Sequence, residues 1–230
     1  MEDLKLEVIS PTLSVYQKKG VFCYGTDAVL LAKYVLNNFK SMKNMKMCDL
    51  FSGTGIIPLF VCDNNKDINA VGVEINKEAC EIAVMSASVS GLSNRYTQIY
   101  ADIKEVKNYF EPESFNFITC NPPYMTANSG YMCDADYKTI ARHEILCNID
   151  VVFKAAFYLL RTGGNLFIVY RSDRLSSLFK AAHNNRFEIK DMVCISSENL
   201  PSNCKLILCK ASKDASEGLS MKISSVNIFS

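Results

Sequence analysis

Five β-prone runs alternate with helical segments along most of this chain, and that order constrains its fold more than any other feature. Strands joined through helices form a parallel sheet with helices on both faces. Two further strands follow without a helix between them, which predicts an antiparallel strand at one edge. The sequence therefore predicts an α/β fold, a doubly wound sheet of seven strands, mostly parallel with one antiparallel edge strand. The expected strands are 45–50, 68–73, 96–100, 115–120, 165–170, 187–195 and 204–210.

A single domain is expected to span the whole chain, 1–230, because no linker, repeat or break in composition divides it. Residues 12–24 resemble a short hairpin with a Gln-Lys-Lys-Gly turn, and Thr26-Asp27 starts a helix with apolar residues at helical spacing. We expect this N-terminal hairpin and helix, 1–44, to pack over the ligand site. Residues 211–230 are expected to form a tail. Further helices are expected at 76–90, 144–160 and 173–184, and an apolar run at 56–62.

The composition is that of a globular domain, with 49% hydrophobic and 21% charged residues. No apolar run reaches the roughly 18 residues that a membrane-spanning helix needs, so no membrane partner is expected. The first residues are acidic and lack the basic-then-apolar order of a secretory signal. We therefore expect a cytoplasmic protein.

Cysteine and histidine usage argues against a metal centre. The chain has 10 cysteines and 2 histidines but no Cys-x-x-Cys pair. Several cysteines, such as Cys48 and Cys120, fall inside apolar runs, which is typical of small buried thiols in a reducing compartment. The net charge of +1, from 25 basic and 24 acidic residues, neither requires nor excludes nucleic acid.

Polar residues follow four consecutive strands, each at the point where the strand is expected to end. In a doubly wound sheet, ligands bind beyond the carboxyl ends of the strands. Because the four stretches meet at one edge, together they predict a ligand site more strongly than any one of them does. They are Asp49 with Gly53 and Gly55, then Glu74, then Asp102, and last Asn121-Pro122-Pro123-Tyr124.

The stretch after the first strand suits a nucleoside better than a dinucleotide. Gly53 and Gly55 allow close approach of the backbone, but Phe51 and Pro58 stand where a pyrophosphate-binding loop prefers glycine. Glu74 follows Gly55 by about 20 residues, the interval at which a carboxylate reaches a ribose diol. S-adenosylmethionine therefore fits better than NAD or FAD.

The tetrapeptide Asn121-Pro122-Pro123-Tyr124 ends the fourth strand, because proline donates no backbone hydrogen bond and restricts the residue before it. The Asn121 side-chain oxygen and the Pro122 carbonyl could each accept one N–H of a planar amine, with Tyr124 against its ring. The alternative is an ordinary Asn-Pro turn with Tyr124 packed in the fold.

Four of the polar residues have structural alternatives to ligand binding. Asp49 is compatible with a turn-forming carboxylate. Asp102 is compatible with an N-cap of a helix over 103–109, and Thr26-Asp27 with a cap of the first helix.

Longer stretches around these residues resemble a known family. The segment 49–59 (DLFSGTGIIPL), Val71-Gly72-Val73-Glu74, Ala101-Asp102 and Asn121-Pro122-Pro123-Tyr124 are similar to class I methyltransferases that methylate amino groups, which have a Rossmann-like fold. The segment 24–32 (YGTDAVLLA) and Ala141-Arg142-His143-Glu144 resemble, more closely, the tRNA(Val) adenine-N6-methyltransferases. These enzymes modify the adenine that follows the anticodon. The similarity covers about residues 10–210.

The resemblance implies S-adenosylmethionine as cofactor and a role for each matching residue. It places the loop with Gly53 and Gly55 under the methionine part of the cofactor, with Asp49 ordering that loop. It assigns the ribose hydroxyls to Glu74, and Ile75 to the face of the adenine. The remaining implied contacts are Asp102 with the adenine amine, Ile103 beside it, and Thr26 and Asp27 near the methionine amino group.

The resemblance also implies the reaction, which is direct displacement of the methyl group by the N6 amine of adenine. Asn121 and Pro122 would accept from that amine, without a general base, and Tyr124 would stack on the base. The partner would be tRNA, bound by a monomer or weak homodimer, with 125–143 bordering the base pocket. Arg142-His143 could meet phosphate, or Arg142 could pair with a carboxylate. Candidates for a basic face are Lys18, Lys19, Arg171, Arg174, Lys180 and Arg186.

Three rival functions stay open at this point. A protein glutamine presents the same NH2 group, although such enzymes usually carry a helical N-terminal domain. A DNA adenine-N6 methyltransferase would need a target-recognition domain, which is not evident. A non-catalytic cofactor- or RNA-binding subunit would have no need of Asn121, Glu74 and Asp102 together.

Overall fold

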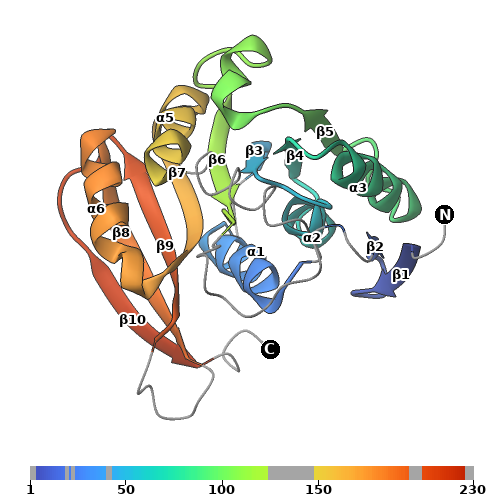
Figure 1. Cartoon of the computed structure of the whole chain (residues 1–230), viewed down its shortest axis with the longest axis horizontal. Coiled ribbons are helices and arrows are strands. Elements are labelled where there is room, and N and C mark those ends of the chain that lie inside the picture. The colour runs from blue at the N-terminus through green and yellow to red at the C-terminus, as the bar shows by residue number, and fades with distance from the viewer. Residues whose placement is uncertain are drawn as a thin grey trace.

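The computed structural model describes residues 4–18, 21, 24–39, 43–123, 148–196 and 204–225. An eight-stranded sheet forms the centre, and a separate two-stranded hairpin lies at one end (Figure 1). This architecture confirms the α/β, doubly wound and mostly parallel fold expected from the sequence. The strands of the sheet are β3 (Met45–Leu50), β4 (Ile68–Glu74), β5 (Tyr96–Tyr100), β6 (Phe115–Cys120), β7 (Leu160–Arg171), β8 (Phe187–Ser196), β9 (Leu206–Lys213) and β10 (Ser220–Ser225).

The strand order is β10-β8-β9-β7-β6-β3-β4-β5, and two details differ from the expectation. The antiparallel strand β9 lies inside the sheet between β7 and β8, not at its edge. Its residues Ile207, Leu208 and Cys209 are fully buried, because a strand covered on both faces and paired on both sides belongs to the sheet centre. The eighth strand, β10, comes from the expected tail and pairs with β8.

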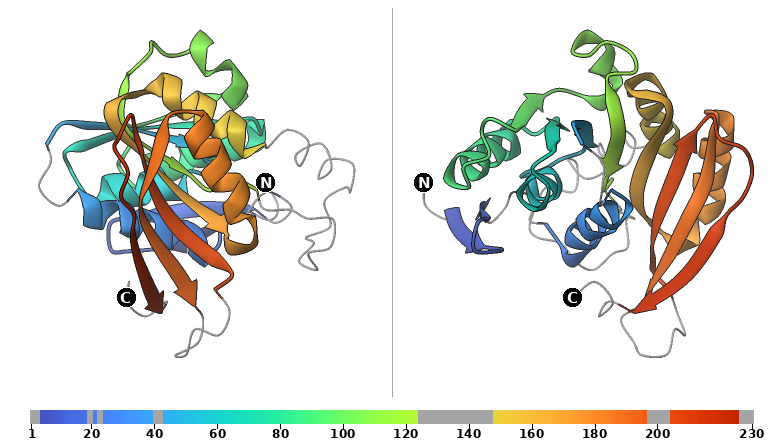
Figure 2. Two further views of the ribbon diagram at one scale, coloured as in Figure 1. Left: turned by 90° about the vertical axis from the view of Figure 1, so that its left-hand side faces the viewer. Right: turned by 180° about the vertical axis from the view of Figure 1, so that it is seen from behind.

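Helices cover both faces of the sheet (Figure 2). Met47 and Phe117 pack among the helices of one face, whereas Cys48 and Ile118 pack among those of the other, because successive side chains of a strand alternate. The first face carries α1 (Thr26–Asn38), α2 (Ile56–Asn64) and α3 (Lys77–Val89), and the second η1 (Ile103–Asn108), α5 (Ile149–Leu159) and α6 (Leu175–Asn184), with the short η2 (Ser172–Arg174) before α6.

An N-terminal hairpin is present, and its turn lies earlier in the chain than the expected one; two residues of the expected turn, 19–20, lie outside the described residues. Its strands are β1 (Leu4–Val8) and β2 (Ser14–Lys18), paired antiparallel. The turn lies at 9–13, where the Ser10 hydroxyl accepts from the Leu13 backbone N–H at 3.0 Å. The hairpin packs on α3, because the backbone N–H of Tyr16 donates to the Ser86 hydroxyl at 2.9 Å.

Helix α5 and strand β7 follow one another directly, whereas the sequence predicted a gap between a helix ending at residue 160 and a strand starting at residue 165. Helix α5 begins at Ile149, since the Asn148 side chain accepts from the Asp150 backbone N–H at 3.1 Å and caps it there. The preceding residues of the expected helix, 144–147, lie outside the described residues. Strand β7 starts directly at Leu160, and a register shift against β6 accommodates its first residues.

Helix α1 is held on the sheet by an aromatic cluster. Phe167 of β7 is fully buried, and its ring centroid lies 5.7 Å from that of Tyr34 and 5.5 Å from that of Phe39. Phe39 also stacks on Phe117 of β6 at 4.4 Å. Such pairs stabilise by about 0.5–1.5 kcal/mol beyond the area they bury. The cluster therefore fixes the position of α1 relative to β6 and β7.

We expect Phe167→Ala to lower the free energy of unfolding by about 3–5 kcal/mol, because it leaves a cavity between α1 and the sheet. Phe179→Ala is the matched control, since Phe179 on α6 is 40% exposed, and it should cost much less. Urea unfolding followed by circular dichroism measures both. Equal losses for the two variants would contradict the role given to the cluster.

Candidate active site at the carboxyl edge of the sheet

The carboxyl ends of β3, β4 and β6 lie level with one another and carry three buried polar side chains. In the parallel register, Asp49 stands beside Gly72 of β4 and beside Thr119 of β6. Glu74 ends β4, and Asn121 follows the last residue of β6. All three polar side chains are at least nine-tenths buried, since Asp49 is 0%, Asn121 8% and Glu74 9% exposed.

Asp49 is a buried carboxyl group with only one of its two oxygens hydrogen-bonded. The Thr119 hydroxyl donates to Oδ1 at 2.5 Å, whereas Oδ2 is buried and has no partner among the described residues. The pKa of Asp49 is raised to about 8, mainly by burial; the hydrogen bond from Thr119 lowers it and the nearby charge of Glu74 raises it. Asp49 thus lies within a strand, not in the turn considered as its alternative. Sequence reasoning missed Thr119, because only the strand register brings it to Asp49.

The loop between β3 and α2 takes a tight left-handed path. Phe51, Gly53 and Gly55 have φ angles of 58°, 53° and 82°. A left-handed φ is strained for phenylalanine and freely accessible to glycine. The Gly53 backbone N–H donates to Glu74 Oε2 at 2.9 Å, so a hydrogen bond from β4 holds the loop. The resemblance gave this ordering role to Asp49, but the described contact comes from Glu74.

Glu74 also organises the start of α3. Its Oε1 accepts from the Asn76 backbone N–H at 2.9 Å, and the Asn76 side chain in turn accepts from the Ala79 backbone N–H at 3.0 Å. Each carboxylate oxygen has a second lone pair, so Glu74 keeps acceptor capacity for a ligand. Ile75, expected against the adenine, is half-buried beside it.

A polar network under the glycine loop was not anticipated from the sequence. The hydroxyls of Ser52 and Tyr96 both donate to the Gln98 side-chain oxygen. A Cβ on Gly72 would lie 2.4 Å from that oxygen and 2.7 Å from the Ser52 hydroxyl oxygen, so this position needs glycine. The informative signal was Gly72 inside a buried strand, since such glycines mark a close approach of other groups.

Asp102 and Ile103 are placed mainly by local structure. The Asp102 carboxylate accepts from the Lys104 backbone N–H at 2.9 Å and caps η1, as the structural alternative proposed. This bond uses Oδ1 only. The Ala101 backbone N–H donates to the Glu74 carbonyl at 2.9 Å and keeps Asp102 near the end of β4. Ile103 is buried in the core under α5.

Asn121 is tied to the start of α1. Its side-chain Nδ2 donates to Asp27 Oδ2 at 3.2 Å, whereas its Oδ1 is buried and finds no partner among the residues that the structure describes. Thr26 is the exposed first residue of α1, and the cap position belongs to Gly25, which makes no side-chain cap. The cap alternative for Thr26-Asp27 is therefore not what the structure has. The start of α1 therefore reaches this edge.

The remaining expected site residues divide into two groups. Pro122 is buried and Pro123 half-buried directly after Asn121. Tyr124, the loop 125–143 and Arg142-His143 lie outside the described residues, so the expectations for them remain predictions. Within the described part of the chain, no cluster of His, Cys, Asp and Glu is arranged to hold a metal ion.

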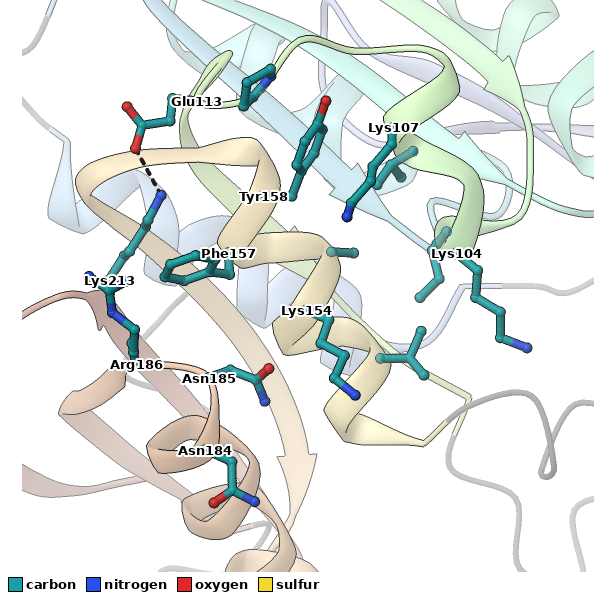
Figure 3. A pocket seen from close by; sticks show the side chains of 15 residues that line it. Lys104, Lys107, Glu113, Lys154, Phe157, Tyr158, Asn184, Asn185, Arg186 and Lys213 are labelled. Atoms are coloured by element: carbon teal, nitrogen blue, oxygen red, sulfur yellow. Dashed lines mark hydrogen bonds and ion pairs between the residues drawn. The ribbon is translucent and has the colours of Figure 1, made fainter.

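A separate cavity of about 960 Å³ lies between η1, α5 and the turn after α6 (Figure 3). It contains none of the expected site residues except Ile103. Lys107 lies 5.3 Å from the centroid of the Tyr158 ring, and Lys154 pairs with Asp150 at 2.7 Å. Sequence reasoning did not single out these lysines, because they are far apart in the chain.

Much of the expected basic face is neutralised by carboxylates. Lys18 pairs with Glu78 at 2.5 Å, Arg171 with Asp173 at 2.6 Å and Arg186 with Asp214 at 2.7 Å. Exposed ion pairs of this kind contribute little to stability, but they lower the positive charge available to a polyanion. Lys19 lies outside the described residues.

The residues at the carboxyl edge fit S-adenosylmethionine. Within the described part of the chain, Asp49 Oδ2 and Asn121 Oδ1 are buried polar atoms without partners, and each such atom costs about 1–3 kcal/mol unless a ligand or water satisfies it. The left-handed loop at Gly53 and Gly55 lies beside Glu74, which holds it through the Gly53 backbone N–H. A cationic nucleoside with a ribose diol and donor groups matches these acceptors.

Part of the chain also matches proteins of known type. A tRNA1(Val) (adenine(37)-N6)-methyltransferase of Flavobacterium psychrophilum is 29% identical over 157 residues, which cover 68% of this chain and 64% of the relative. The enzyme of the same name from Aliivibrio salmonicida is 25% identical over 80% of this chain and 74% of its own length. The chain thus spans less than two-thirds of the first of these relatives.

Solved structures agree on the fold. A predicted O-methyltransferase from Agrobacterium tumefaciens superimposes with a TM-score of 0.69 over 86% of both chains, at 19% identity. TrmN from Thermus thermophilus gives a TM-score of 0.60 over 81% of this chain and 51% of its own, also at 19% identity. The model of the methyltransferase small domain matches residues 12–184. The chain therefore belongs to the methyltransferase small domain family.

Proposed function

We propose that this protein is an S-adenosylmethionine-dependent methyltransferase that modifies the exocyclic N6 amine of an adenine in RNA. The most specific form of the proposal is tRNA(Val), at the adenine next to the anticodon. The observation that carries it is the buried, unpartnered Oδ1 of Asn121 at the end of β6, because a lone acceptor in an Asn-Pro-Pro turn suits an amine donor.

The chain's own residues would act by positioning and by accepting hydrogen bonds. The cofactor supplies a methyl group activated by its sulfonium. The lone pair of an adenine amine is delocalised into the ring, so Asn121 Oδ1 and the Pro122 carbonyl would favour the pyramidal, positively charged form that develops. Positioning of amine and methyl group contributes up to about 7–11 kcal/mol. No residue is needed as a matched general base, because the methylated amine is acidic enough to lose its proton to water.

RNA is favoured over the rival acceptors by two observations. The relatives at 25–29% identity are named as tRNA1(Val) methyltransferases. The cavity beyond Ile103 is lined by Lys104 and Lys107, which give a polyanion a positive surface near η1 and so favour a nucleic acid over a protein acceptor. A protein glutamine or DNA adenine acceptor stays the alternative, as does a non-catalytic subunit. We expect action in the cytoplasm, by a monomer or weak homodimer.

Methyl transfer to cell fractions would identify the acceptor. Total tRNA, ribosomal RNA, DNA and protein from cells lacking this enzyme would be incubated with the purified protein and methyl-labelled S-adenosylmethionine. We expect label in tRNA, recovered as N6-methyladenosine after digestion. Label in protein or DNA alone would overturn the RNA assignment, and no label in any fraction would favour a non-catalytic role.

Asn121→Ala should lower kcat by on the order of 100-fold or more, while the Kd for S-adenosylhomocysteine changes little. The physical reason is that the variant removes an acceptor for the amine without touching Asp49 or Glu74. Single-turnover methyl transfer and calorimetry measure the two quantities. An unchanged rate would remove Asn121 from the mechanism.

Cofactor binding should release a proton from Asp49. Because the pKa of Asp49 is raised to about 8, its carboxyl is mostly protonated at pH 7 before binding. A cationic ligand favours the ionised form, so affinity should rise with pH up to about 8 and then level off. Calorimetry of S-adenosylmethionine binding at pH 7, in two buffers of different ionisation enthalpy, counts the protons. Asp49→Asn should reduce that count, and an identical count in wild type and variant would contradict the assignment.

A further inference from the structure

In the described part of the chain, the side-chain amide of Asn121 has a hydrogen-bond partner at its nitrogen but none at its oxygen. Its Nδ2 donates to Asp27 Oδ2 at 3.2 Å, and its Oδ1 is buried with no partner in the described ranges of the chain. The residue is 8% exposed, so water satisfies little of that oxygen's capacity. The one described contact thus engages the donor end and leaves the acceptor end for a ligand.

Asp27 permits only one of the two orientations of this planar amide. An ionised carboxylate accepts hydrogen bonds and cannot donate one. If the amide rotated by 180°, its oxygen would face the Asp27 carboxylate, so the hydrogen bond would be lost and two acceptors would be brought together. The opposite end would then present an NH2 group to the amine of the acceptor, donor against donor.

The Asp27 carboxylate is itself fixed by the fold. It lies in the first turn of α1, and its Oδ1 accepts from the Ala28 backbone N–H at 2.9 Å. A Cβ on Gly25 would lie only 2.6 Å from that Oδ1, so the missing side chain of Gly25 leaves the room that the carboxylate occupies. The aromatic cluster around Phe167 anchors the rest of α1 to the sheet.

We propose that Asp27 is a positioning residue that sets the orientation of the Asn121 amide, so that its oxygen faces the amine to be methylated. The catalytic consequence rests on the proposed function, whereas the hydrogen bond itself does not. In this role Asp27 acts through Asn121 and needs no contact with the methionine amino group, which is where the sequence resemblance placed it.

A double-mutant cycle separates the two roles. Asp27→Ala should lower kcat by on the order of 10- to 100-fold with the KM for S-adenosylmethionine nearly unchanged. Because Asp27 acts through Asn121, Asp27→Ala should add no further loss in an Asn121→Ala background. Independent, multiplicative losses, or a loss confined to KM, would overturn the proposal. Asp67→Ala, an exposed carboxylate before β4, is the control that should keep the wild-type rate.

Two conservative variants test the geometry rather than the presence of a side chain. Asp27→Asn can still accept from Asn121 Nδ2 but can also pair with the flipped amide, so its rate should lie between those of wild type and Asp27→Ala. Gly25→Ala should displace the carboxylate, a flexible end group, and lower kcat without a large loss of stability. A wild-type rate in Gly25→Ala, or an Asp27→Asn rate as low as that of Asp27→Ala, would count against the proposal.

The hydrogen bond also has a readout that needs no activity. The Asn121 side-chain NH2 resonances in a ¹⁵N-labelled sample are identified by their absence in Asn121→Ala. They should shift in Asp27→Ala and stay in place in Asp67→Ala. An unchanged Asn121 amide in Asp27→Ala would overturn the proposal. If wild-type protein methylates no acceptor, the proposed function fails, but the amide resonances still decide whether Asp27 holds Asn121.

Discussion

The in-register parallel pairing of β3 with β4 and β6 is the constraint on which the rest of the site depends. It sets Asp49 between Gly72 and Thr119, so the three strands end level with one another. Glu74 and Asn121, which follow those ends, then face the same edge. Because side chains alternate along a strand, a slip of one residue in β6 would turn Thr119 to the opposite face and leave Asp49 without its partner. The register therefore decides which polar groups meet.

The site contains buried polar atoms without partners in the described residues and a strained backbone residue, and both features lower the stability of the fold. Asp49 Oδ2 and Asn121 Oδ1 are buried acceptors without partners, and Phe51 occupies a left-handed conformation that suits glycine. Unsatisfied buried groups and backbone strain each cost about 1–3 kcal/mol and cluster at functional sites. Their coincidence at one sheet edge indicates a ligand site, since a ligand can satisfy both acceptors at once. The closely packed Ser52 and Gln98 beneath the loop supply the compensating rigidity.

Helix α1 connects the hydrophobic core to this edge. Tyr34 in its second half and the cap residue Phe39 pack against Phe167, and its first turn carries Asp27, which holds Asn121. Two distant segments, the start of α1 and the end of β6, thus form one unit. The packing of α1 in the core and the orientation of the Asn121 amide at the edge are therefore coupled. A change in one is expected to alter the other. The hairpin packs on α3.

The sequence by itself determined the order of strands and helices, and it located the polar edge, because periodicity and turn residues are local properties. It also pointed to Asn121 and Glu74 through their place at strand ends. Only the tertiary structure decided that β9 lies inside the sheet, that β10 exists, that Glu74 holds the glycine loop, and that Asp27 meets Asn121. These results depend on pairing and on contacts between residues far apart in the chain. Such contacts leave no local pattern in the sequence. The same strands would be compatible with several pairing registers, and only the packing of the whole fold selects one of them.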